Sequence, residues 1–195
     1  MSEFSAYFQL GFDHILDFAA FDHMLFLVAL CAMFRPGEWR ELLILITAFT
    51  IGHSLTLALA TTGSVQVDSS VIELLIPLTI LFTALHNVFR AENSLRSAMN
   101  RRLNYLLVLF FGLIHGMGFS GYLRALLGDE ENILLPLFSF NLGVELGQIV
   151  IVAFIMIVAY IAISRLQFKH REWNLFLSGA AAGVSLLLIY NNWIW

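Results

Sequence analysis

Charged side chains are scarce in this sequence. Asp, Glu, Lys and Arg make up only 12% of its 195 residues, roughly half of the share in a typical soluble domain, whereas 59% of the residues are hydrophobic. No basic patch is present, so nothing predicts nucleic-acid binding. The single cysteine, Cys31, cannot form an internal disulfide and is expected to be a small core residue. These absences argue against a soluble domain and against a nucleic-acid-binding protein.

Long apolar segments recur along most of the chain. They predict an all-α fold, a polytopic membrane helix bundle that forms one integral domain over residues 1–195 and is surrounded by lipid. A short amphipathic helix is expected over residues 4–18, before the first span. The fifth segment exceeds the roughly 20 residues that a span needs, so it must tilt, bend or project. The six predicted spans are about 19–34, 41–61, 71–89, 104–122, 133–164 and 174–194.

The basic residues fall unevenly between these segments. The loops after the second and fourth segments contain only Arg124, beside acidic residues. By the positive-inside rule, both termini are predicted to lie outside the cytoplasm, in a multi-pass protein of the inner (plasma) membrane. The other basic residues follow the first, third and fifth segments: Arg35 and Arg40; Arg90, Arg96, Arg101 and Arg102; Arg165, Lys169 and Arg171.

Ionisable residues occur inside the apolar segments, where burial in lipid costs roughly 2.5 kcal/mol or more. At 1.5 Å per residue, His53 lies about 18 Å into the second segment, and His115 and Glu145 reach similar depths in the fourth and fifth. Asp22 and His23 begin the first segment, on the outer side. Because four segments bring His, Asp or Glu to the middle or outer half of the membrane, we predict one shared metal site, open to the outer face. Imidazole and carboxylate ligands suit a divalent transition metal such as Zn, Ni, Cu or Fe.

Further polar residues accompany these predicted ligands at helical spacing. Thr47, Thr50 and Ser54 share a stripe with His53, and Asn141 and Gln148 share another with Glu145. Side chains of this kind orient metal ligands or replace one of them. The predicted supporting or alternative ligands are His14, Ser54, Glu73, Asn141 and Gln148.

Glycines bracket two of the predicted ligands. Gly112 and Gly116 lie around His115, and Gly143 and Gly147 lie around Glu145. Small residues at this spacing allow helices to pack closely. Each polar residue also has a structural interpretation. A buried histidine can bond a neighbouring helix, a threonine can bond its own backbone, and His14 can face solvent.

Four stretches resemble the HupE/UreJ family of small membrane proteins. They are "HILDFAAFDHMLFLVAL", "TAFTIGHSLTLALA", "FGLIHGMGFSGYLRALLG" and "FNLGVELGQ", and the resemblance extends over about residues 8–190. It implies a nickel or cobalt permease associated with hydrogenase or urease accessory functions, with His14, Asp22 and His23 matching a metal-binding element. The chain departs from that element: two extra residues separate His14 from Asp22, and its proline and glycine are missing.

Three functions are open at this point. The first is transport or binding of a nickel-like divalent metal, for which His86 is the one obvious polar step in the inner half. The second is an intramembrane zinc-dependent hydrolase acting on a lipid or membrane-embedded substrate, with Glu145 or Asp22 as general base. The third is a non-catalytic accessory subunit. The sequence leaves open whether the chain is an enzyme and whether it binds a second copy or another membrane protein.

Overall fold

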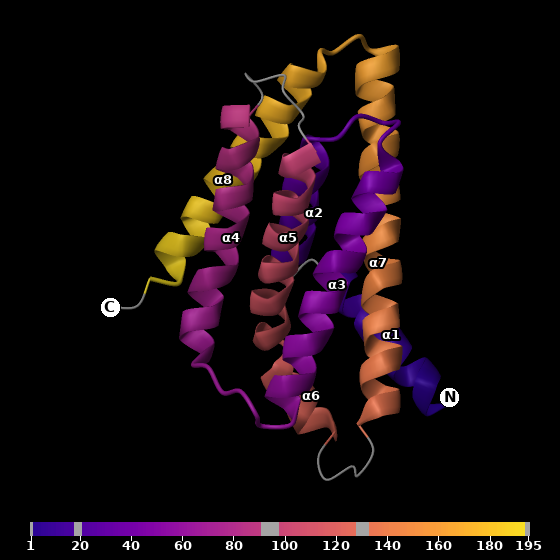
Figure 1. The fold of residues 1–195 in the computed structure, drawn as a ribbon, viewed down its shortest axis with the longest axis vertical. Coiled ribbons are helices and arrows are strands. Elements are labelled where there is room, and N and C mark those ends of the chain that lie inside the picture. Colours follow the sequence, from indigo (N-terminus) through magenta and orange to yellow (C-terminus); the bar gives the residue numbers. More distant parts are fainter. Residues whose placement is uncertain (1, 18–20, 91–97, 128–132, 194–195) are drawn as a thin grey trace.

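The computed structural model describes residues 2–17, 21–90, 98–127 and 133–193, which form a bundle of helices (Figure 1). The described residues contain no β-strand, which confirms the all-α fold class. The helices are α1 (Glu3–Leu16), α2 (Asp22–Ala32), α3 (Trp39–Thr61), α4 (Ser69–Arg90), α5 (Ala98–Gly118), α6 (Ser120–Leu127), α7 (Leu134–Tyr160), the π-helical turn η2 (Ile161–Arg165) and α8 (His170–Asn191).

Four helical segments among the described residues are long and apolar enough to cross a membrane. Counting α5 and α6 as one bent crossing raises the number to five, not the six that the sequence predicts. Large apolar side chains such as Ile44, Phe110 and Phe154 are exposed on these segments, as expected for helices that contact lipid. The four segments are Trp39–Thr61, Ser69–Phe89, Leu134–Arg165 and His170–Asn191.

The predicted first span, 19–34, does not contain a helix of spanning length. Its helix, α2, has 11 residues and is therefore about 16 Å long, roughly half of the hydrocarbon thickness. It begins at Asp22, whose carboxylate accepts a hydrogen bond from the backbone N–H of His23 at 2.9 Å, and it ends at Ala32, shortly before Pro36. Residues 19 and 20 lie outside the described part of the chain. The apolar composition extends beyond the C-terminal end of the helix, so hydropathy overestimates its length.

The predicted fourth span, 104–122, is bent rather than straight. The axes of α5 and α6 differ by 48° across Phe119. Just before the bend, Gly118 lies close to the start of α4, where an added Cβ would be 3.2 Å from the Cδ1 atom of Ile76. The bend places the Phe119 ring against His14, with ring centroids 4.1 Å apart. Hydropathy cannot report this change of direction.

The helix α1 lies along α7 (Figure 1). Its apolar face is buried there, because glycines bring the two backbones together. A Cβ at Gly11 would collide with the carbonyl of Phe140, and a Cβ at Gly143 would collide with that of Phe8. The amphipathic pattern of residues 4–18 therefore corresponds to a helix that is packed into the bundle.

A second glycine contact joins α3 and α5. A Cβ at Gly112 would collide with the carbonyl of Phe49, and a Cβ at Gly116 would collide with the carbonyl of His53. Close packing at the Gly112 and Gly116 pair is what the spacing predicts. It brings His53 and His115 onto adjoining faces of two helices.

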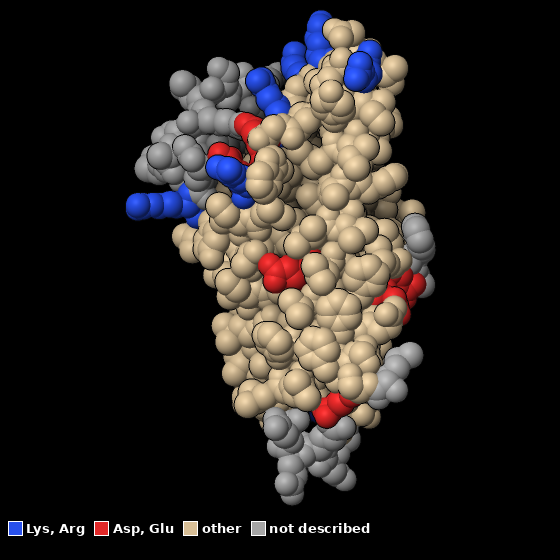
Figure 2. All heavy atoms as spheres, turned by 90° about the vertical axis from the view of Figure 1, so that its right-hand side faces the viewer, with Lys and Arg blue, Asp and Glu red and all other residues tan. Residues whose placement is uncertain are grey.

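Lys and Arg side chains gather at one end of the molecule, the upper end in Figure 2. We call this the basic end. It holds the connection between α2 and α3, with Arg35, the start of α3, with Arg40, and the connection between η2 and α8, with Lys169. On the face drawn in Figure 2, the lower part of the molecule shows acidic groups and no Lys or Arg.

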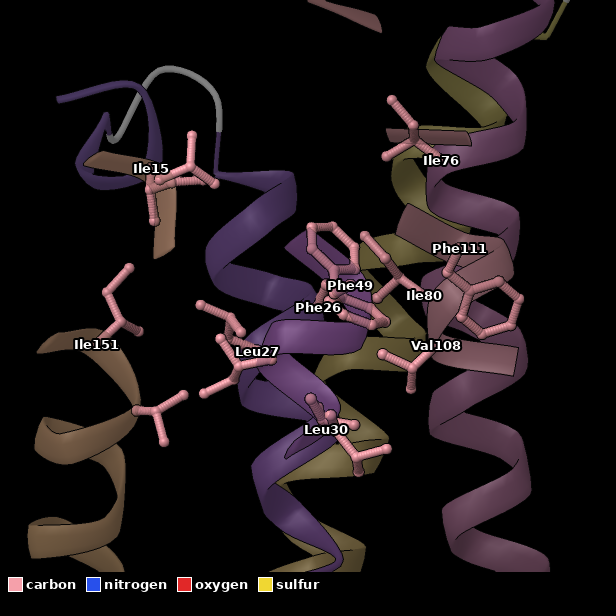
Figure 3. Packing of buried hydrophobic residues seen from close by; sticks show 14 of the residues in the cluster. Ile15, Phe26, Leu27, Leu30, Phe49, Ile76, Ile80, Val108, Phe111 and Ile151 are labelled. Atoms are coloured by element: carbon pink, nitrogen blue, oxygen red, sulfur yellow. The ribbon is translucent and has the colours of Figure 1, made fainter. Parts of the chain in front are cut away.

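The centre of the core is formed by aromatic and branched side chains of α2 to α5. Phe26 and Phe49 are each 1% exposed and stack with ring centroids 4.9 Å apart. Figure 3 shows these two rings beside each other, near Ile80 and Val108, with Leu27 and Leu30 further along α2. This apolar block lies directly against the polar site described next.

Candidate metal centre

Four histidines from four helices meet in the interior of the bundle. They are His14 at the end of α1, His23 at the start of α2, His53 in α3 and His115 in α5. One ring nitrogen from each of His14, His23 and His53 lies within 4.8 Å of the others. The ring of His115 is 5.3 Å from the ring of His23, centroid to centroid. We call these four residues the histidine centre.

The Nε2 atom of every histidine in this centre is buried and has no hydrogen-bond partner. Leaving a buried polar atom unpaired costs about 1–3 kcal/mol, and such atoms are rare in folded proteins. Four of them in one place suggest a shared ligand. A neutral imidazole offers a nitrogen lone pair, and this is the donor that divalent transition metals prefer from histidine.

The opposite ring nitrogen, Nδ1, is held by the protein in three of the four histidines. The Nδ1 atom of His23 lies 3.1 Å from the Asp22 carboxylate, that of His53 lies 3.3 Å from the amide oxygen of Asn141, and that of His115 lies 2.9 Å from the Phe111 carbonyl. These oxygens are acceptors, so each neutral ring carries its proton on Nδ1 and presents the Nε2 lone pair. Partners of this kind orient metal-binding histidines and raise their basicity.

The acceptor for His53 is itself fixed. The amide nitrogen of Asn141 donates to the Leu137 carbonyl at 2.7 Å, which directs the amide oxygen toward His53. Asn141 lies on the polar stripe of α7 that the sequence predicts. The structure therefore places Asn141 as a residue that orients a candidate ligand.

The two predicted polar stripes face each other across α3 and α7. The Thr47 hydroxyl donates to the Glu145 carboxylate at 2.8 Å, and the Thr50 hydroxyl donates to the Gln148 amide oxygen at 3.1 Å. Ser54 instead donates to the backbone carbonyl of Thr50 at 2.7 Å. The contacts of Thr47 and Thr50 hold α7 against α3.

Glu145 is placed differently from the predicted histidines. Its carboxylate accepts the Thr47 hydrogen bond in the contact between α3 and α7. His14, which the sequence offers as an alternative ligand, lies with His23 and His53. Asp22 does reach the centre. Its carboxylate contacts the Nδ1 atom of His23 and does not form a separate candidate ligand.

His14 is the residue that the sequence reasoning underrated. Its ring centroid is 4.8 Å from that of His23, 4.1 Å from Phe119 and 5.9 Å from Phe140. Three residues before it, Gly11 makes the close contact of α1 with α7. This small residue one helical turn away is the signal that the His14 side of α1 faces another helix and not solvent.

An open cavity of about 780 Å³ adjoins the histidine centre. His14, His23 and His115 form part of its wall, and Glu73, at the start of α4, lines it as well. Glu73 is exposed, so it lies at this cavity rather than in the buried cluster. The centre can therefore be reached from the cavity.

Apolar spanning helices around a buried group of histidines define a class: a polytopic membrane protein with a candidate intramembrane metal centre. The family model described as HupE / UreJ protein matches residues 1–195, so the chain belongs to the HupE/UreJ family. No curated protein and no solved structure matches the chain.

Proposed function

We propose that this protein binds a divalent transition metal of the nickel type at the histidine centre and moves it across the inner membrane. The observation that carries the proposal is the set of four buried Nε2 atoms without a hydrogen-bond partner, contributed by His14, His23, His53 and His115. Membership of the HupE/UreJ family supports it. Asp22 assists by holding the ring of His23.

The distribution of charge supports an orientation. The basic end lies in the cytoplasm by the positive-inside rule, and the cavity beside the centre opens toward the opposite, outer side. Both termini are then outside the cytoplasm. A metal ion enters the cavity, exchanges water for imidazole nitrogen, and leaves toward the basic end past His86.

The direct experiment is elemental analysis of purified protein after incubation with Ni²⁺, Co²⁺ or Zn²⁺ in detergent. The protein is expected to bind about one metal per chain, and the double variant His53→Ala/His115→Ala is expected to bind none. His170→Ala is the matched control, because His170 lies at the start of α8, outside the centre. Equal metal content in the native protein and the double variant would refute the centre.

Transport needs its own test. Proteoliposomes that contain native protein are expected to accumulate Ni²⁺ or Co²⁺, and those with the double variant are expected to show only the leak of empty liposomes. If the native protein binds metal but well-folded protein shows no flux of any divalent metal, the centre stands and the transport function fails.

An intramembrane metallohydrolase is a second candidate, because the cavity beside the centre is large enough for a lipid or peptide segment. Such an enzyme needs a carboxylate free to act as general base. Asp22 is bound to His23, and Glu145 is bound to Thr47. Both bases that the sequence suggests are thus occupied in supporting contacts, and membership of the HupE/UreJ family favours transport. Hydrolysis of lipid or peptide substrates by zinc-loaded protein, lost in the double variant, would reverse this choice.

A further inference from the structure

The cavity next to the histidine centre is strongly acidic. Its wall includes the carboxylates of Asp13, Asp17, Asp22 and Glu73, contributed by α1, α2, α4 and the residue that follows α1. Among the described residues, no Lys or Arg side chain lines it. We call this cavity the acidic vestibule.

The vestibule leads to ligand-binding atoms. His23 and His115 are part of its wall and are 4% and 0% exposed. Their Nε2 atoms have no hydrogen-bond partner. This observation is independent of the carboxylates, and it identifies the vestibule as the approach to the histidine centre.

The carboxylates divide into two groups by their contacts. Asp22 bonds His23 and therefore belongs to the centre. Asp13, Asp17 and Glu73 are exposed and lie at the vestibule wall, and Asp13 accepts a hydrogen bond from the Gln9 amide at 2.8 Å. Of these three, Asp13 and Glu73 lie on different helices, α1 and α4, and can act on ions in solution without touching the histidines' supporting bonds.

The size of the vestibule suits a hydrated ion. Six waters occupy roughly 200 Å³ at about 30 Å³ each, well below the vestibule volume of about 780 Å³. A cleft lined by one sign of charge raises the local concentration of counter-ions and speeds their association by about 10- to 1,000-fold. A divalent cation gains twice as much from this field as a monovalent one, because the energy scales with charge.

We propose that the acidic vestibule captures hydrated divalent cations from the outer solution, and that Asp13 and Glu73 set the rate at which they reach the histidine centre. The proposal rests on the function proposed above, because it requires the centre to bind metal. It assigns to Asp13 and Glu73 a role in capture that is separate from ligation. Loss of these charges slows loading, whereas the metal content at saturation stays the same.

The test is stopped-flow measurement of Co²⁺ association, followed by visible absorption, on full-length protein in detergent. The double variant Asp13→Asn/Glu73→Gln is compared with Glu3→Gln/Asp68→Asn, which removes the same two charges outside the vestibule wall. At about 10 mM salt, where the Debye length is about 30 Å, the vestibule variant is expected to associate roughly tenfold more slowly than native protein. The control is expected to change by less than about twofold, because its carboxylates do not line the vestibule.

The dependence of the association rate on salt provides a second measurement. Association of Co²⁺ with native protein is expected to slow as ionic strength rises, and the difference from the vestibule variant is expected to vanish near 1 M salt, where the Debye length is about 3 Å. If native protein binds Co²⁺ at a rate independent of salt, or if the two double variants behave alike, the vestibule role is overturned and the centre is unaffected. If native protein binds no Co²⁺, both proposals fail.

Discussion

The two sides of the histidine centre have opposite character. On one side lies the acidic vestibule, with a volume of about 780 Å³ and carboxylates in its wall. On the other side, toward the basic end, lie three buried phenylalanines, Phe26, Phe49 and Phe111. The polar side is open, whereas the apolar side is closed by the described residues, so the centre is accessible from the vestibule side.

Each of the three phenylalanines lies about one helical turn from a histidine of the centre. Phe26 comes three residues after His23, Phe49 four residues before His53, and Phe111 four residues before His115. In each helix this is about one turn, 5.4 Å, toward the basic end. The rings of Phe26 and Phe49 lie 5.5 Å and 5.1 Å from that of His115. We call these three residues the phenylalanine layer.

Beyond the phenylalanine layer lies a cavity of only about 30 Å³, lined by His86, Asn104 and Thr83 among others. This volume corresponds to about one water molecule. Under the proposed transport function, a metal ion that moves from the centre toward the basic end would have to displace this layer.

The largest effect is expected from closing the space that the histidines occupy. In Gly116→Ala, the new Cβ meets the His53 carbonyl and the Thr56 hydroxyl. Overpacking of this kind costs about 1–3 kcal/mol of stability, and metal binding should fall with it. Thermal unfolding in detergent measures the change. Gly179→Ala is the control, because nothing lies within 4 Å of its added Cβ; equal melting temperatures for the two variants would contradict the close contact of α3 with α5.

The next largest effect is expected on metal affinity, when the residue that orients a candidate ligand is changed. Asp22→Asn preserves the shape of the side chain but removes the charge that faces the Nδ1 atom of His23. Loss of such a partner lowers metal affinity by about 10- to 100-fold. Competition with a chelator of known affinity measures it. Unchanged affinity would show that Asp22 does not orient His23.

The phenylalanine layer is expected to have a moderate effect on rate. Phe111→Leu keeps the position apolar but shortens the side chain, so Co²⁺ bound at the centre should exchange with the solution at the basic end up to about tenfold faster, equivalent to about 1.4 kcal/mol of barrier. The measurement is release of bound Co²⁺ to a membrane-impermeant chelator at the basic end of oriented proteoliposomes. Phe110→Leu is the matched control, because Phe110 is 54% exposed, whereas Phe111 is 6% exposed. Equal release rates in both variants would remove the layer as a barrier.

The smallest effect is expected at Glu145. Its carboxylate bonds Thr47, so Glu145→Gln should change metal affinity by less than about threefold, well below the loss that follows removal of a partner of a metal-binding histidine. Isothermal titration with Ni²⁺ measures this. A loss as large as that of the double histidine variant would restore Glu145 to the ligand set that the sequence predicts.

The sequence shows which residues are expensive to bury, and this is why it indicates His23, His53 and His115 as candidate ligands. The depth of each residue follows from its position along a helix, and the three histidines do converge. The direction in which a buried side chain points is harder to infer from the sequence. Glu145 has the same depth and spacing signals as the histidines, but its partner depends on how α7 is rotated against α3, which composition does not encode.

Prediction of the fold from the sequence is limited in the same way. Hydropathy correctly locates α3, α4, α7 and α8 because long helices in lipid must be apolar along their length. It fails at α2, where an apolar segment contains only a short helix, and at the bend between α5 and α6. It also cannot tell an amphipathic helix at the membrane surface from α1, because packing on α7 requires the same pattern of apolar residues.

X-ray absorption spectroscopy of nickel- or zinc-loaded protein tests the histidine centre most directly. The arrangement predicts three or four imidazole nitrogens around the metal, with Zn–N distances of about 2.0–2.1 Å, and this signal should disappear in His53→Ala/His115→Ala. A first shell made only of oxygen atoms, without the multiple scattering of imidazole and identical in the double variant, would show that the metal binds elsewhere and would contradict the account.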